Sequence, residues 1–212
     1  YAKNILFDYG YRYFYEDGYG KDYRIFNLPE KETRQRYTYL TAALLAFYQQ
    51  QRYFREEHRE LSQWNLAVPL WVFVGASVVK DDGSKESAKN YNERASDIAQ
   101  VLGFLAWFLG EKEQAKQALS AVYQGDAASA GLIDKQGNEI FSGSFPWLKE
   151  QQLTVEALYR DILTLTFHAA GGGTLNVDRI TGDSGELLLK VGEAEKPFGL
   201  INVGDALDLA EH

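Results

Sequence analysis

The chain has 212 residues, of which 45% are hydrophobic and 25% charged, and its formal net charge is −8. This length is enough to bury roughly 70% of the unfolded surface, and the acidic balance disfavours the broad basic surface of a stand-alone nucleic-acid-binding protein. Cysteine is absent, which excludes disulfides and thiolate ligands, and the three histidines are too scattered to indicate a metal site.

The sequence shows no membrane or secretory signal. No leader pattern opens it, and no apolar run approaches the roughly 18 residues that span a bilayer. We therefore expect a cytoplasmic protein with no membrane partner. Since the chain begins with Tyr1 and contains no methionine, we expect it to be an internal piece of a longer polypeptide.

Aromatic residues crowd the first segment, residues 4–28. Such rings can stack on unpaired nucleic-acid bases, or they can pack in a core or an interface. Because the segment carries little excess positive charge, we favour packing. Residues 22–28 alternate polar and apolar side chains, which predicts a half-buried strand.

A long helix is predicted over residues 33–61. Its apolar stripe recurs at spacings of three, four or seven residues and contains Leu40, Leu44, Phe47, Phe54 and Leu61. On the polar side Arg52 and Glu56 are spaced for an i,i+4 ion pair. The arginines of that side could contact phosphate, but the glutamates between them favour a solvated face.

The most apolar stretch is residues 68–77, which contains Pro69 near its start and Gly75 near its end. The run does not alternate apolar and polar residues, so it predicts a strand, about residues 69–75, that is buried on both faces. Such strands occupy the centre of parallel, helix-covered sheets, where ligands lie beyond the carboxyl ends. Residues 75–80 are therefore the first place to look for function.

The remaining elements follow from apolar periodicity and from turn residues. We expect a polar loop at 80–92, helices ending near Gly110, Tyr123 and Phe167, two short strands within 132–141, an antiparallel hairpin formed by 174–180 and 186–191, and a last strand at 198–205. Residues 171–173 are three glycines. No G-x-x-x-x-G-K-[ST] motif surrounds them, so we interpret them as a flexible connector and not as a phosphate cradle.

No complete catalytic motif is present. Ser77 and Ser84 lack a G-x-S-x-G elbow, no histidine is placed as an evident base, and Walker A and Asp-Glu-x-His boxes are missing. These 212 residues alone are therefore not expected to hydrolyse nucleotide.

Five blocks of the sequence carry a resemblance: NILFDY at 4–9, YFYEDGYGKDYRI at 13–25, LLAFYQQ at 44–50, PLWVFVGASV at 69–78 and PFGLINVGD at 197–205. In content and order they resemble the middle of the DEAD/DEAH-box helicase subunits related to the R (Res) subunit of type III restriction enzymes. Members of that family close two RecA-like lobes on ATP and Mg²⁺ and move along DNA.

The resemblance implies an α/β fold, in which a partial RecA-like lobe with a parallel sheet carries an inserted α+β region containing the hairpin. Residues 1–62 would be an aromatic connecting segment and the long helix, 63–110 the start of the second lobe, and 111–212 the insertion. The chain would then be an inactive piece of an ATP-dependent DNA helicase or translocase. Its partners would be DNA, the rest of the helicase chain and a modification subunit.

The family's pattern also implies a contact with the nucleic-acid backbone just after the opening strand, at Gly75, Ala76 and Ser77, with Lys80 as an addition. The plain alternative is that Gly75 and Ser77 only end a strand. No nuclease motif is visible, and two other functions stay open. One is a non-catalytic protein-interaction module, and the other is a small-molecule-binding α/β enzyme with its pocket beyond Gly75.

Overall fold

The computed structural model describes residues 9–20, 33–74, 85–125, 132–133, 137–141, 143–180 and 185–202, with the backbone alone for 33–34 and 85–97. The chain divides into two compact units, Tyr1–Lys31 and Glu32–His212. Gly75, Ala76, Ser77 and Lys80 lie outside the described residues, as do all of 22–28 and residues 80–84 of the predicted loop at 80–92.

The smaller unit contains one short helix, α1 (Tyr11–Glu16). Its rings contact one another, with Tyr9 and Tyr13 stacked at 6.5 Å between centroids, yet none of the helix residues is buried. Tyr19 is the most open of these rings, at 69% exposure. The described aromatics of this unit therefore form no buried core. We also expected that these aromatic rings could pack in an interface with a partner, and that stays a prediction.

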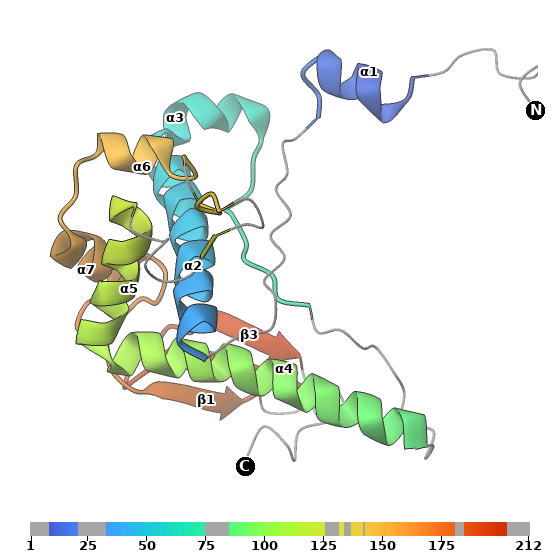
Figure 1. Cartoon of the computed structure of the whole chain (residues 1–212), viewed down its shortest axis with the longest axis vertical. Helices are drawn as coiled ribbons and strands as arrows, with labels where there is room; N and C mark the ends of the chain where they lie inside the picture. The colour runs from blue at the N-terminus through green and yellow to red at the C-terminus, as the bar shows by residue number, and fades with distance from the viewer. Residues whose placement is uncertain are drawn as a thin grey trace, which may run out of the picture. The chain divides into compact units, whose positions relative to one another are not determined.

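The larger unit is built from helices followed by a small sheet (Figure 1). The described elements, in chain order, are α2 (Thr33–Glu56), α3 (His58–Leu61), the 3₁₀ turn η2 (Ser62–Trp64), α4 (Lys85–Gly110), α5 (Lys112–Gln124), α6 (Pro146–Glu150), α7 (Val155–Leu165), β1 (Leu175–Arg179), β2 (Glu186–Val191) and β3 (Gly199–Asn202). The prediction of an α/β chain is confirmed at this level.

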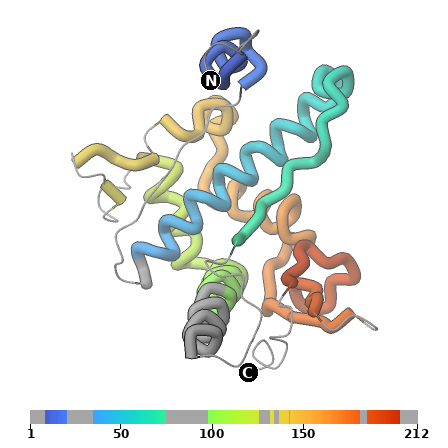
Figure 2. The backbone as a smooth tube through the Cα atoms, turned by 90° about the vertical axis from the view of Figure 1, so that its right-hand side faces the viewer, coloured from blue at the N-terminus to red at the C-terminus, as the bar shows by residue number. Residues whose placement is uncertain are grey.

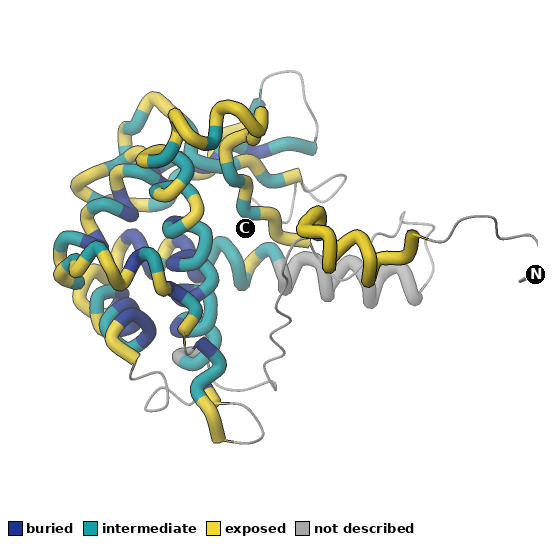
Figure 3. The backbone as a smooth tube through the Cα atoms, turned by 90° about the horizontal axis from the view of Figure 1, so that it is seen from above, coloured by how far each residue is buried: buried dark blue, intermediate teal, exposed yellow. Residues whose placement is uncertain are grey.

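The helices pack through the apolar stripes that the sequence predicts. Figure 3 shows the buried stretches where the helices of this unit face one another. The fully buried large side chains include Leu44, Leu45 and Tyr48 of α2, Phe104 and Phe108 of α4, Leu119 of α5, and Leu158 and Ile162 of α7. α4 begins at Lys85, so the predicted polar loop is wrong for residues 85–92. These residues contain no Gly or Pro, and their polarity concealed a stretch that is compatible with a helix.

The sheet is antiparallel, with strand order β1-β2-β3. Leu187 pairs with Arg179 on one side and Ile201 on the other, and alternate residues of β2 (Leu187, Leu189, Val191) are buried. The predicted hairpin and last strand are thus confirmed within the described residues. The two short strands expected in 132–141 are reduced to one bridge, between Ile133 and Glu139.

The predicted buried parallel strand is not seen in the described residues 68–74. They belong to none of the described strands, and Leu70 and Val74 are 81% and 83% exposed. An unbroken apolar run indicates that a strand can be covered on both faces by other parts of a protein. It does not show that both layers come from the same 212 residues, and the described part of the chain supplies only one.

A polar cluster ties α2 to α7. The buried Tyr48 hydroxyl donates a hydrogen bond to the Asp161 carboxylate, and Arg52 Nε lies 2.6 Å from Glu56 Oε1, which confirms the predicted i,i+4 pair. The Arg52 guanidinium also stands 5.8 Å from the centre of the Trp147 ring. Burial, together with the bond to Asp161, raises the pKa of Tyr48 well above its ordinary value.

We predict that Phe108→Ala lowers the free energy of unfolding by about 3–5 kcal/mol, because it removes a fully buried ring from the meeting point of α4 and α7. Leu70→Ala is the matched control, since its side chain is mostly exposed, and should change stability by less than about 0.5 kcal/mol. Urea unfolding measures both values. Equal losses for the two variants would contradict the described core.

Stability should also fall at alkaline pH through Tyr48. A folded-state pKa above the unfolded value of 10.0 gives a stabilising contribution that is complete below pH 10 and lost as pH rises through the folded pKa. The wild type should therefore lose stability more steeply above pH 10 than Tyr48→Phe does. Urea midpoints at pH 9 and at pH 11 test this. Parallel pH profiles for the two proteins would show that folding does not raise the pKa of Tyr48.

Candidate functional site

The extended segment, residues 66–74, is the first candidate site. Asn65 ends η2 in a left-handed conformation with φ 49°, which turns the backbone out of the helical path. Pro69 then fixes its own φ and restricts Val68 to extended conformations, while the β-branched valines favour the same region. Figure 2 shows the segment as an extended trace that returns beside α2.

One face of the extended segment packs on α2. The Trp71 ring lies 5.7 Å from the Phe47 ring and 4.4 Å from the Phe73 ring, measured between centroids. Pro69 and Trp71 are half-buried, and Phe73 is the most open of the three. Phe47 belongs to the predicted stripe of α2, so this helix holds the segment through a residue that the sequence had placed on its apolar side.

The opposite face is a row of aliphatic side chains in solvent. We call it the aliphatic row, and it consists of every second residue of the segment, with exposures from 51% to 83%: Leu66, Val68, Leu70, Val72 and Val74. Complete burial of one such side chain contributes about 1.5–3 kcal/mol. Given these exposures, covering the whole row would contribute on the order of 5–10 kcal/mol.

The backbone of the extended segment is also open. No described residue provides a hydrogen-bond partner for the main-chain N–H and C=O groups of residues 66–74. The segment is therefore a β-prone chain with one apolar face partly covered, the other uncovered, and no strand beside it among the described residues. Such an arrangement can bind another polypeptide by adding a strand and by covering the row.

The structure does not test whether the site residues expected from the resemblance lie close together. Gly75, Ala76, Ser77 and Lys80 follow the extended segment in the chain but lie outside the described residues. Their selection relied on the carboxyl end of a buried parallel strand. That premise does not hold for the described strands, which are all antiparallel.

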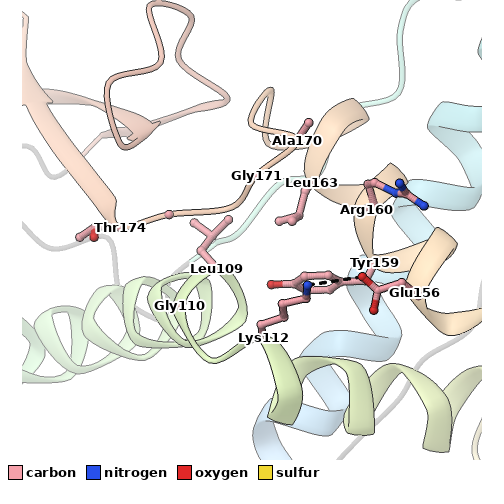
Figure 4. Close-up of a pocket in the computed structure, with 11 residues that line it drawn as sticks. Leu109, Gly110, Lys112, Glu156, Tyr159, Arg160, Leu163, Ala170, Gly171 and Thr174 are labelled. Carbon is pink, nitrogen blue, oxygen red and sulfur yellow. Dashed lines mark ion pairs between the residues drawn. The ribbon is translucent and has the colours of Figure 1, made fainter.

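A second candidate is a pocket of about 450 Å³ between α4, α5, α7 and the connector to β1. Figure 4 shows Lys112 and Glu156 turned toward one another at its floor, beside Tyr159. The glycine run also lines it, through Gly171 and Gly173. No sequence motif pointed to this pocket, because its walls come from residues up to 65 positions apart, Leu109 to Thr174.

Three polar side chains of the pocket, Lys112, Glu156 and Tyr159, already have partners. Glu156 Oε2 accepts a hydrogen bond from Lys116 at 2.9 Å, and its Oε1 lies 3.4 Å from Lys112 Nζ. The bond from Lys116, followed by that from Lys112, holds the pKa of Glu156 below its usual value. The Tyr159 hydroxyl donates to the Phe108 carbonyl at 3.0 Å. These contacts leave a structural ion-pair cluster and no evident nucleophile with its base.

The glycines have a structural explanation. Gly172 and Gly173 adopt φ of 70° and 144°, which side-chain-bearing residues rarely reach. A Cβ at residue 173 would also stand 3.3 Å from Val191 Cγ1. The run does connect α7 to β1, as expected, and backbone geometry and close packing explain the glycines at residues 172 and 173.

No protein-family model, curated protein or solved structure matches the chain. The described residues contain no group of His, Asp or Glu that could hold a metal ion, and none of their helices is long and apolar enough to cross a membrane.

Within the pocket wall, Gly173→Ala should destabilise the protein by about 1–3 kcal/mol, because alanine resists the positive φ and its Cβ crowds Val191. Gly171→Ala is the matched control. Its φ is not positive and a Cβ there meets nothing within 4 Å, so stability should change little. Thermal unfolding of the two variants measures the difference. If Gly173→Ala is neutral, the connector does not hold this conformation in solution.

Proposed function

We propose that this chain is a non-catalytic structural module, and that its extended segment binds a polypeptide segment from outside these 212 residues. The main support for this proposal is the aliphatic row. It consists of five exposed side chains on a segment whose backbone has no described hydrogen-bond partner. Exposed apolar patches of this kind mark interaction sites in folded proteins. Covering the row contributes favourably on the order of 5–10 kcal/mol, which is comparable with the 4–15 kcal/mol cost of association.

The assembly that we propose is an ATP-dependent DNA helicase or translocase of the restriction-enzyme R-subunit type. What supports it is the order of the five sequence blocks, of which PLWVFVGASV includes most of the extended segment. In that assembly, residues 69–75 would be a strand of a RecA-like parallel sheet whose other strands come from outside this chain. The covering layer that the aliphatic row lacks would then be a helix of the same lobe.

In this proposal ATP and Mg²⁺ bind elsewhere in the longer protein, which acts in the cytoplasm. Gly75, Ala76 and Ser77, with Lys80, contact the DNA backbone. Small residues permit close approach, and a hydroxyl or main-chain N–H can bind phosphate without reading sequence. The net charge of −8 means that this chain adds local contacts and not the main grip on DNA.

The second candidate function is a protein-interaction module with no role on DNA. The net negative charge of the chain favours this function, and so do the exposed aromatic rings of α1. The only basic residue of α1 is Arg12, whose Nε lies 2.8 Å from Glu16 Oε1. Tyrosine-rich, weakly charged surfaces are typical of protein interfaces. Both candidates use the aliphatic row in the same way, and ATP hydrolysis separates them.

The test is DNA-stimulated ATP hydrolysis by the longest polypeptide that contains this sequence. We expect activity there and none in the 212 residues alone. Leu70→Asp in the longer protein should reduce the stimulated rate at least tenfold, because it places a charge in the covered row. The matched control is Trp64→Asp, which changes a 68%-exposed side chain just outside the row and should leave the rate within twofold.

A well-folded longer protein without DNA-stimulated hydrolysis would rule out the motor and leave the interaction module. Full activity in Leu70→Asp would instead reject the docking role of the aliphatic row, whichever assembly the chain belongs to.

A further inference from the structure

We infer that the extended segment accepts one added β-strand, and that this strand binds along only one of its two edges. The inference rests on the proposed docking function and goes further, because it names the edge and the kind of partner strand. It follows from the position of Pro69, from the alternation of exposure, and from the absence of charge in the segment.

The two edges of an extended chain are formed by different residues. The N–H and C=O of one residue point to the same edge, and those of the next residue point to the opposite edge. Residues 66, 68, 70, 72 and 74 therefore form one edge, which we call the even edge, and residues 67, 69, 71 and 73 form the odd edge. The residues of the even edge are also those whose side chains make up the aliphatic row.

Pro69 disables the odd edge. Proline has no N–H, so a strand placed there would lose a donor in the middle of its ladder. The even edge has a complete set of donors and acceptors from Leu66 to Val74, and no described residue occupies them. An added strand is therefore expected beside the even edge.

The partner strand must be uncharged and aliphatic at alternate positions. Residues opposite one another on paired strands project from the same face of the sheet. The partner's side chains would thus extend the aliphatic row sideways, and the apolar layer that covers the row would cover them too. Residues 65–74 contain no charged side chain, in a chain that is 25% charged, so a charge on the partner strand would find no counter-charge in the segment.

The probe is a synthetic peptide with the sequence of residues 66–74, which has this chemistry, carrying lysines outside the paired stretch for solubility. It is added to the ¹⁵N-labelled chain, and amide hydrogen exchange is followed residue by residue. We expect exchange at Leu70, Val72 and Val74 to slow at least tenfold at saturation, and exchange at Trp71 and Phe73 to stay within twofold of the free protein.

Two N-methylated peptides serve as matched controls, because they keep every side chain and remove chosen donors. In antiparallel pairing with the aliphatic faces matched, the peptide also bonds through its even residues, so methylation at the amides that correspond to Leu70 and Val72 should abolish the protection. Methylation at those corresponding to Trp71 and Phe73 should leave it. Protection at Trp71 and Phe73 of the protein, or no protection by millimolar peptide, would overturn the inference.

These outcomes are distinct from failure of the proposed function. If both edges are protected in the assembled longer protein, docking stands and the single-edge inference falls. If the segment exchanges as fast in the assembly as in the free chain, docking itself fails.

Discussion

The apolar side of α2 is the surface on which the larger unit depends. Leu44, Leu45 and Tyr48 are fully buried there, and Phe47, half-buried on the same helix, holds Trp71. The helices α5 and α7 both pack against α2, and Tyr48 adds a polar link to Asp161 of α7. A helix of this length gains most of its stability from such packing and little from intrinsic propensity. α2 therefore serves both as the core of the unit and as the support of the extended segment.

Local patterns predicted most of this fold. The stripe of α2 and the apolar residues of α7 each carry a helical period, and the turn residues before β2 mark where that strand begins. Thr154 is an example of such local control, since its side chain accepts a hydrogen bond from the Ala157 N–H and caps the start of α7. The sequence did not predict a helix at residues 85–92, because this mostly polar stretch has no apolar stripe that would indicate one.

The candidate sites were harder to predict, because burial is a property of neighbours and not of a stretch alone. Residues 69–74 satisfy the pattern of a strand covered on both faces, and what exposes Leu70 and Val74 is the absence of a second layer among the described residues. Pro69 was available as a signal that one edge of this strand is impaired. The Lys112–Glu156 pair had no signal at all, since it depends on how α5 meets α7.

The extended segment has a consequence for the life of the chain in a cell. An uncharged, extended, aliphatic stretch of this length, open along its backbone, has the features that chaperones bind and that proteases cleave. A copy that meets no partner would be held or degraded through this stretch, while an assembled copy would be spared. The abundance of the chain would then follow the supply of its partner more closely than its own rate of synthesis.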